Sequence, residues 1–288
     1  MGLENLKTLL SGVGAMDYAV PAYNILNHLT LKAVIEECEA GRSPVIIQTS
    51  VATVKFYGPE VLALMAKSEI ELACVPVALH LDHCTDPDLA KKCVDCGWSS
   101  IMFDGSGMPF DENISLTKEI ADYAHPKGVS VEGELGAIHG VEDHIDVKEE
   151  DAHLADVRQS AEFVQKTGID AFAPAVGTAH GMYKGEPKLD FDRFSEIRSV
   201  IGDIPLVVHG GTGLSSEAFD RFIQLGAAKI NVSTAIKQSY MKSMRRYAAE
   251  NEENNPLVFD RYIVDNVRTV VKEHNELFRS VGRIEPYI

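Results

Sequence analysis

Val75-Pro-Val-Ala-Leu-His-Leu-Asp-His83 is the stretch that decides the fold of this chain. It is an apolar run that is entered at a proline and ends in an acid and a base, a pattern that predicts a strand buried on both faces. In a regular strand Asp82 and His83 would point to opposite faces, but both can reach one cavity where the strand frays into a loop. Because α/β folds place their active sites at the C-terminal ends of strands, we expect these two side chains to carry chemistry.

Two later stretches repeat this design, Ala173-Pro-Ala-Val-Gly-Thr-Ala-His180 and Pro205-Leu-Val-Val-His209. Each is an apolar strand whose end carries one histidine followed directly by glycine. Three histidines from three strand ends, with carboxylates nearby, form the ligand set of a catalytic zinc ion whose fourth position is open. One such histidine alone would favour a structural role. The repetition favours a metal site formed by His83, His180 and His209.

The charge of the chain limits its partners. The 288 residues include 43 acidic and 27 basic side chains, a formal net charge of −16. This charge argues against a nucleic-acid or membrane-surface partner, and a phosphorylated substrate would need a locally positive pocket. No stretch approaches the roughly 18 apolar residues of a membrane span, and residues 1–7 lack the charged-then-apolar order of a signal peptide. We therefore expect a cytoplasmic protein.

Eight strand-like segments alternate with amphipathic helical segments along the chain. The expected strands are 19–25, 44–50, 75–83, 99–104, 129–135, 171–177, 205–210 and 229–233, and the expected helices include 29–40, 59–71, 114–124, 155–166, 191–200 and 216–225. This alternation predicts a (β/α)8 TIM barrel, an α/β fold, with a doubly wound sheet as the alternative. No linker interrupts the pattern, so we expect residues 1–288 to form a single domain.

After the last expected strand, the chain carries two helical segments where a barrel needs only one. The first spans 238–251, a break follows at Asn254-Asn-Pro256, and the second spans 260–280. We therefore expect residues 256–288 to form a C-terminal helical extension. Such an extension either packs across a neighbouring subunit, as in a homodimer or homotetramer, or caps the base of the barrel.

Polar side chains stand at the C-terminal end of every expected strand, with apolar residues behind them. A barrel enzyme needs such a lining at its mouth, whereas a binding scaffold does not. In chain order these side chains are Asn24, Gln48, Ser50, Asp82, His83, Asp104, Glu132, Glu134, His180, His209, Asn231 and Ser233.

Two connections that follow expected strands, 136–151 and 177–188, are longer than the usual two to six or so residues. Loops of this length in a compact barrel are more often active-site lids than loops without a function. The first contains Gly136 and Gly140 and carries Glu142, so a flexible segment can move this acid into and out of the site. A solvated loop acid is the alternative interpretation of Glu142.

Two strand ends predict a phosphate-binding site. The glycines of His209-Gly-Gly-Thr-Gly213 let backbone amides approach an anion, and Thr212 and Ser233 add hydroxyl donors. A helix N-terminus is expected after each of the two loops, and the loops after strands seven and eight are the recurring phosphate site of barrel enzymes. Lys184, in the loop after His180, can supply one mobile cation.

These motifs together resemble one known family. Over nearly its whole length the chain resembles the zinc-dependent class II ketose-bisphosphate aldolases, the fructose- and tagatose-bisphosphate aldolase group. The matching stretches are Tyr18-Ala-Val-Pro-Ala-Tyr-Asn24, His80-Leu-Asp-His83, residues 99–104, Val131-Glu-Gly-Glu-Leu-Gly136, Gly177-Thr-Ala-His-Gly-Met-Tyr183, His209-Gly-Gly-Thr-Gly213 and Lys229-Ile-Asn-Val-Ser-Thr234.

The resemblance implies a role for each of several residues. It implies that His83, His180 and His209 hold a catalytic zinc ion, that Asp82 is the catalytic acid/base and that Glu142 transfers a proton from the lid. It implies a second, alternative cation position at Asp104 and Glu134. With Asn24, Ser50 and Lys184 from the mouth and its loops, the candidate substrate- and phosphate-binding residues are Gly181, Gly210, Gly211, Thr212, Asn231, Val232, Ser233 and Thr234.

The chain departs from the family pattern in two places. Thr212 stands where relatives commonly have serine, which retains the hydroxyl group. Relatives often carry an Asp-Pro-Arg-Lys-Tyr-like segment near the C-terminus, where this chain reads Val258-Phe-Asp-Arg261-Tyr-Ile-Val-Asp-Asn-Val-Arg268. In the family an arginine from this region can contact the far phosphate of the substrate, and the sequence leaves open whether Arg261 or Arg268 does so here.

The implied reaction breaks a carbon–carbon bond beside a ketone and leaves a carbanion that must be delocalised into an enediolate. A zinc ion that chelates the ketone and the adjacent hydroxyl can act as a Lewis acid and serve as the electron sink for this carbanion. Asp82 would take the proton of the C4 hydroxyl, and Glu142 would protonate the enediolate to give dihydroxyacetone phosphate. The rival sink is a Schiff base, which needs a lysine projecting from mid-strand into the barrel; Lys229 opens its expected strand at the wrong end.

Other functions use the same residues. A zinc-dependent phosphosugar isomerase or epimerase would share the metal and phosphate sites, and a non-catalytic homologue would be expected to have lost Asp82 or a histidine. Within the aldolases, the sequence does not distinguish a fructose from a tagatose substrate, nor from a deoxy-gluconate or sulfonated analogue.

Overall fold

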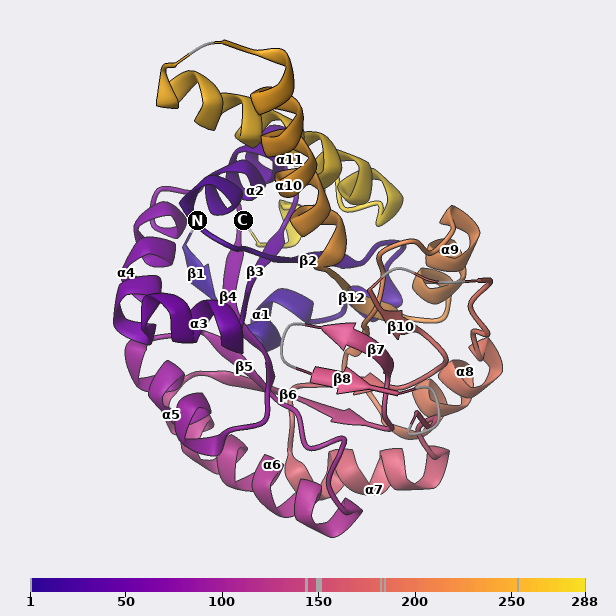
Figure 1. Ribbon diagram of the computed structural model, residues 1–288. Helices are drawn as coiled ribbons and strands as arrows, with labels where there is room; N and C mark the ends of the chain where they lie inside the picture. Colours follow the sequence, from indigo (N-terminus) through magenta and orange to yellow (C-terminus); the bar gives the residue numbers. More distant parts are fainter. Residues whose placement is uncertain are drawn as a thin grey trace.

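The computed structural model describes residues 2–142, 145–148, 152–181, 183, 185–252 and 254–287, and for residues 141, 142 and 145–147 it describes the backbone alone. Within these residues, eight parallel strands form a closed barrel in which each strand pairs with the next and the last pairs with the first (Figure 1). In this order they are β2 (Val20–Asn24), β3 (Val45–Ser50), β4 (Val77–Cys84), β5 (Ser100–Phe103), β6 (Ser130–Leu135), β9 (Ala171–Pro174), β11 (Leu206–Val208) and β12 (Ala227–Val232). All eight predicted strands are confirmed, and the fold is a TIM barrel rather than a doubly wound sheet.

Helices surround the barrel on its outer side (Figure 1). Two elements near the N-terminus, α1 and the short strand β1 (Leu3–Glu4), were not predicted, and neither was α3, which begins where the Ser50 hydroxyl accepts a hydrogen bond from the Thr53 amide. The α-helices of the described residues are α1 (Leu6–Leu10), α2 (His28–Gly41), α3 (Val51–Tyr57), α4 (Pro59–Ile70), α5 (Pro87–Cys96), α6 (Phe110–Ala124), α7 (Val157–Thr167), α8 (Phe191–Val200), α9 (Ser216–Gln224), α10 (Thr234–Glu250) and α11 (Pro256–Leu277). Short 3-10 helices lie at Val13–Ala15, His125–Lys127 and Glu285–Tyr287.

The apolar core has two parts. The larger part lies between the outward faces of the strands and the surrounding helices. The smaller part fills the base of the barrel, where α1 contacts β4 and β6 from below. Its strand residues are mostly small and its α1 residues are leucines, so apolar packing closes the base of the barrel interior. Its members include Leu6, Leu9, Leu10, Ala22, Ala78, Ala171, Ala173 and Ala228.

Strand β4 reaches the mouth with a bulge instead of fraying. It continues through Cys84, and its pairing with β5 shifts register between Leu81 and Cys84. His83 lies at the bulge with φ 46°, in the left-handed region that residues other than glycine seldom adopt. The irregularity breaks the alternation of side chains, so Asp82 and His83 both face the barrel axis, as predicted, although by a different local geometry.

The two long connections at the mouth pair with each other, which the sequence did not predict. Strands β7 (His139–Glu142) and β8 (Ile145–Val147) form an antiparallel hairpin after β6, and β10 (Ala179–His180), after β9, pairs in parallel with β7 (Figure 1). Gly140 has φ 116°, and a side chain there would meet the backbone of His180. This close approach requires glycine and joins the two connections.

The C-terminal helices α10 and α11 pack on each other, and their paired ends extend beyond the barrel (Figure 1). Helix α11 also packs along α2, and the chain then returns to the base of the barrel, where the Tyr287 hydroxyl donates to the carbonyl of Leu9. Among the described residues, no helix combines the length and the apolar character needed to cross a lipid bilayer.

Candidate active site and metal centre

Three histidines meet at the mouth of the barrel. His83 comes from the bulge in β4, His180 from β10 and His209 from the residue after β11, and all three are buried. Their candidate ligand atoms lie within 4.8 Å of one another. The predicted trio is therefore brought together in space.

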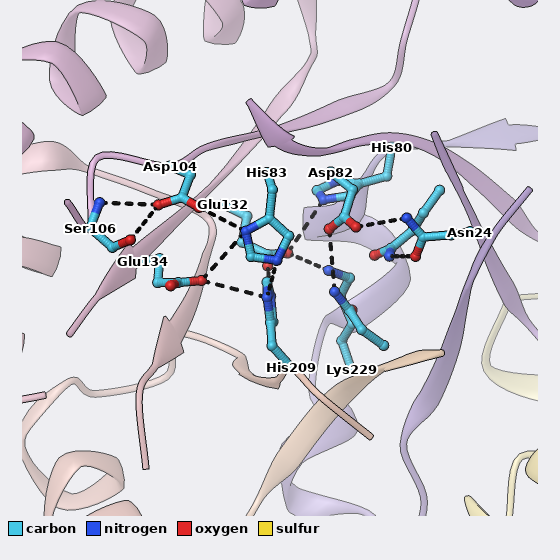
Figure 2. A network of polar contacts seen from close by, with 12 residues as sticks. Asn24, His80, Asp82, His83, Asp104, Ser106, Glu132, Glu134, His209 and Lys229 are labelled. Carbon is cyan, nitrogen blue, oxygen red and sulfur yellow. Dashed lines mark hydrogen bonds and ion pairs between the residues drawn. The ribbon is translucent and has the colours of Figure 1, made fainter. Parts of the chain in front are cut away.

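Hydrogen bonds fix which nitrogen of two of these rings faces the centre. Asp104 Oδ2 lies 2.8 Å from His83 Nδ1, and Glu132 Oε1 lies 2.8 Å from His209 Nε2 (Figure 2). The remaining nitrogens, His83 Nε2 and His209 Nδ1, face each other at 2.8 Å. A histidine that gives one N–H to a carboxylate presents the lone pair of its other nitrogen, the usual arrangement of a metal-bound imidazole.

The donor set fits a zinc ion. Burial lowers the pKa of His180 to about 3. Burial and the positive charge of His83 hold the pKa of His209 well below its usual range. Both rings are therefore neutral, as metal ligands must be. Burial opposes a charge on His83, but Asp82 and the hydrogen bond to Asp104 raise its pKa well above the usual range. The surroundings thus favour one positive charge at the centre. Two nitrogens on one tetrahedral zinc ion lie about 3.3 Å apart, only about half an ångström more than the present spacing.

A second group of possible metal ligands adjoins the first. His83, Asp104 and Glu134 place one ligand atom each within 4.8 Å of one another, and all three are buried. Burial and the neighbouring charge of Asp104 raise the pKa of Glu134 well above its usual range. A cation at this position would relieve the repulsion between the two carboxylates. The structure therefore brings together the residues predicted for an alternative cation position.

Asp82 lies beside the histidines and is held by two amides. Asn24 Nδ2 donates to Asp82 Oδ2 at 2.8 Å (Figure 2). Asn231 Nδ2 donates to Asp82 Oδ1 at 3.3 Å. Gln48 Nε2 in turn donates to the side-chain oxygen of Asn24 at 2.8 Å. Burial raises the pKa of Asp82, but the positive charges of His83 and Lys229 outweigh this and lower it. The carboxylate is thus ionised and fixed in orientation, as a proton acceptor requires.

Lys229 corrects one expectation from the sequence. Strand β12 begins at Ala227, two residues before the predicted start, so Lys229 lies within the strand. Its side chain is completely buried inside the barrel, where Nζ lies 2.7 Å from Glu132 Oε2 (Figure 2). The argument that this lysine stands at the wrong end of its strand is therefore wrong. Within the barrel this lysine is paired with Glu132.

The two strand ends predicted to bind phosphate lie against each other. The backbone amide of Ala235, in the first turn of α10, donates to Thr212 Oγ1 at 3.3 Å. Gly210 has φ 69° and Gly211 approaches the backbone of Asn231 too closely for a side chain. These contacts explain why glycines occupy both positions.

Only one of the two expected helix N-termini is available to an anion. Ser215 caps α9 by accepting from the Ala218 amide, whereas α10 has no side-chain cap at Ser233. Within the described residues, Ser233 Oγ and Asn231 Oδ1 are buried and make no hydrogen bond. An uncapped helix N-terminus beside unsatisfied polar atoms is a suitable place for a phosphate group.

The remaining candidates are placed as follows. Ser50 is occupied as the N-cap of α3, Gly181 follows β10 with φ 86°, Val232 is buried as the last residue of β12, and Thr234 begins α10. Lys184 and the side chain of Glu142 lie outside the described residues.

The two C-terminal arginines bind the outer surface of the barrel. Arg261 and Arg268 both form ion pairs with Glu36 of α2, and Arg268 also pairs with Glu37. Neither arginine contributes to the polar network at the mouth of its own chain.

A hollow at the base of the barrel also carries charged side chains, but it differs from the site at the mouth. Its volume is about 950 Å³, and its lining includes Lys7, His125, Asp170 and Arg198. Asp170 binds His125 Nε2 at 2.9 Å and lies 3.4 Å from Lys7 Nζ. Among the described residues, groups able to hold a metal ion occur only at the mouth.

Comparison with known proteins agrees with this geometry. Residues 4–283 match the model of a family described as fructose-bisphosphate aldolase class-II. The chain is 33% identical to the YdjI aldolase from Escherichia coli K12, over 98% of this chain and 100% of that one, with a TM-score of 0.87. It is 32% identical to a putative fructose-1,6-biphosphate aldolase from Coccidioides immitis, over 98% of both chains, with a TM-score of 0.91.

A third solved structure, the fructose-bisphosphate aldolase from Campylobacter jejuni, is 22% identical to the chain with a TM-score of 0.77 and supports the fold alone. The family match spans nearly the whole chain. The barrel that this chain forms carries three histidines and a fixed carboxylate at its mouth. This chain therefore belongs to the class II fructose-bisphosphate aldolase family and is an aldolase, an enzyme of the aldehyde-lyase class.

Proposed function

We propose that the protein uses zinc to cleave a phosphorylated ketose reversibly, a fructose- or tagatose-1,6-bisphosphate, to dihydroxyacetone phosphate and an aldehyde such as glyceraldehyde 3-phosphate. The observation that carries this proposal is the meeting of His83, His180 and His209 beside a buried carboxylate that two amides hold in place. A metal site next to an oriented base is what carbon–carbon cleavage beside a ketone requires.

His83, His180 and His209 would hold the zinc ion, His83 through Nε2 and His209 through Nδ1, because their other ring nitrogens are bonded to Asp104 and Glu132. When bound, zinc supplies a Lewis acid for the ketone and adjacent hydroxyl oxygens. Asp104 and Glu134, with His83, would offer the alternative position for a cation.

Asp82 would accept the proton of the C4 hydroxyl as the carbon–carbon bond breaks. Its lowered pKa keeps it ionised, and Asn24 and Asn231 keep it turned toward the mouth. In the reverse direction the same group would return the proton to the new hydroxyl. Glu142, carried by the β7–β8 hairpin, would deliver the proton that completes dihydroxyacetone phosphate.

The phosphate of the dihydroxyacetone half would lie between the ends of β11 and β12. Gly210 and Gly211 leave room for their amides to approach it, and Ser233 and the uncapped N-terminus of α10 provide further donors. Lys184 would add a positive charge. Asn24 and Ser50 would contact the substrate from the ends of β2 and β3, and Gly181, Thr212, Val232 and Thr234 would complete the phosphate loop region.

We further propose that residues 1–288 form one barrel domain, that 256–288 is a C-terminal extension and that the protein is a homodimer or homotetramer. Large apolar side chains are exposed on two parts of the surface: Phe56 and Leu64 on α3 and α4 are 81% and 71% exposed, and Leu257 at the start of α11 is 75% exposed. Contacts with a second copy would cover such side chains. Light scattering of the parent and of Leu257→Ser tests this assignment, which a monomeric parent would contradict.

A panel of substrates tests the proposed reaction. Fructose and tagatose 1,6-bisphosphate, a deoxy-gluconate phosphate and a sulfonated analogue are each supplied at equal concentration, and release of triose phosphate is followed by a coupled assay. We expect release from at least one of the two bisphosphates. Isomerised or epimerised product without loss of carbon from any substrate would contradict cleavage and support a phosphosugar isomerase or epimerase.

A further inference from the structure

We infer that Lys229 and Glu132 are a positioning pair that sets the tautomer of His209 and raises the affinity of the site for zinc. The inference rests on the proposed function, because it assumes that His209 is a metal ligand. It assigns a role to a buried lysine that the proposed reaction does not otherwise use.

The contacts form a continuous chain across the barrel. Lys229 Nζ of β12 lies 2.7 Å from Glu132 Oε2 of β6, and Glu132 Oε1 lies 2.8 Å from His209 Nε2 (Figure 2). All three side chains have no exposed surface. The two oxygens of one carboxylate thus join the lysine to the imidazole, with no water exposure to weaken either contact.

Glu132 determines which nitrogen of His209 carries the hydrogen. A carboxylate oxygen only accepts hydrogen bonds, so His209 Nε2 is the protonated nitrogen and Nδ1, which faces His83 at 2.8 Å, has the free lone pair. In metal sites a carboxylate in this position orients the ring and makes the ligating nitrogen more basic.

Lys229 holds that carboxylate in place. Its ammonium group binds Oε2 at 2.7 Å, which leaves Oε1 directed at His209 Nε2 at 2.8 Å. His80 Nε2 also lies 3.7 Å from Glu132 Oε2, and its Nδ1 is bonded to Ser100 Oγ at 2.8 Å. Burial and the charge of Lys229 lower the pKa of His80 well below its usual range, so Lys229 is the cation that balances Glu132.

Stability alone does not account for this pair. Removing two charges from water is costly, and replacing a buried ion pair by apolar residues of similar size is often neutral or stabilising. The base of this barrel is filled by alanines and leucines, so an apolar solution is available to the fold nearby. A charged pair that ends on a candidate metal ligand is better explained by what it does to that ligand.

The test compares zinc affinity in the whole purified protein, measured by competition with a chromogenic chelator. The double variant Glu132→Gln/Lys229→Met removes both charges at nearly constant volume and leaves no unpaired buried ion. We expect it to fold and to bind zinc about 10- to 100-fold more weakly than the parent. Asp170→Asn is the matched control, because Asp170 also joins a lysine to a histidine Nε2 but lies at the base of the barrel, and its zinc affinity should equal that of the parent.

A second measurement reports the tautomer directly. In ¹⁵N-histidine-labelled, zinc-loaded parent, His209 should show a protonated Nε2 and a metal-bound Nδ1. In the double variant we expect the Nε2–H resonance to lose the downfield shift that a charged acceptor causes. Parent-like zinc affinity, or an unchanged His209 resonance, would overturn the inference.

The experiment also distinguishes a variant that fails to fold, and a failure of the proposed metal site, from a failure of the inference. If the double variant does not fold, Glu132→Gln alone is used, which keeps an acceptor for His209; it must show weaker zinc binding, and parent-like affinity in it also overturns the inference. If the parent binds no zinc, or if His83→Ala binds zinc as tightly as the parent, it is the proposed metal site that fails and not the role of the pair.

Discussion

His83 Nε2 and His209 Nδ1 lie 2.8 Å apart, and a carboxylate binds the opposite side of each ring, Asp104 behind His83 and Glu132 behind His209. Neither ring can rotate without breaking its bond to a buried acid. The two nitrogens are therefore held toward one point before any ion is bound, which lowers the cost of organising the site.

The histidines should be needed for the metal and not only for activity. We predict that His83→Ala, His180→Ala and His209→Ala each lose zinc and cleavage together, because three protein ligands are the usual minimum for a catalytic zinc ion. Metal content is measured by atomic emission after dialysis. His274→Ala serves as control, since His274 is also largely enclosed but bonds to a carbonyl within α11. Stoichiometric zinc in all three site variants would rule out the assignment.

Asp82 should be separable from the metal. Asp82→Ala is expected to keep zinc and to keep proton exchange on dihydroxyacetone phosphate at a substantial fraction of the parent rate. Cleavage should fall by about 10²- to 10⁴-fold, the usual contribution of a general acid or base. Exchange and cleavage are measured on the same preparation. Loss of metal, or loss of exchange in step with cleavage, would show that Asp82 supports the architecture of the site instead.

Tyr183 should matter for phosphate binding without touching the metal. Its hydroxyl accepts from the Ala179 amide at 3.0 Å and donates to the Gly210 carbonyl at 2.9 Å, which ties β10 to the loop after β11. Tyr183→Phe removes both bonds, a change of about 1–3 kcal/mol, and should raise KM about tenfold with zinc content unchanged. Burial raises the pKa of Tyr183 to about 12, so the effect should be the same at pH 7 and pH 9. An unchanged KM would show that this tie does not shape the phosphate loop.

Much of the fold follows from the sequence for simple physical reasons. Strands buried on both faces are apolar runs, and parallel strands all end at one side of a barrel, so the strand-end histidines at positions 83, 180 and 209 were expected to meet. The helix boundaries were also close to those found. Phe191–Val200 was predicted without error, because Asp190 caps it and its apolar spacing is regular.

What the sequence did not predict depends on register and on contacts between distant segments. Lys229 meets Glu132 because β12 starts at Ala227, a shift of two residues that no local pattern marks. The bulge at His83 and the pairing of β7 with β10 likewise arise from how neighbouring strands fit together. Glu132 was recognised as a polar residue of the mouth, but its role as the partner of His209 required the structure.

Glu142 should act on the proton-transfer step alone. Glu142→Ala is expected to keep zinc and to bind dihydroxyacetone phosphate, yet to exchange the C3 proton of that ligand with solvent much more slowly. Exchange is followed by NMR in deuterated water. Glu186→Ala, an exposed acid in the other long connection, should exchange at the parent rate. Parent-rate exchange in Glu142→Ala would mean that another group moves the proton.

The most direct test of the account is removal and return of the metal, with triose phosphate release as the readout. We predict that chelator treatment abolishes cleavage of the bisphosphate substrate and that the first equivalent of zinc per chain restores it. Borohydride added with dihydroxyacetone phosphate should leave the mass of the protein unchanged, since Lys229 is held by Glu132. Full cleavage by the metal-free protein, with borohydride fixing a triose on Lys229, would contradict the account.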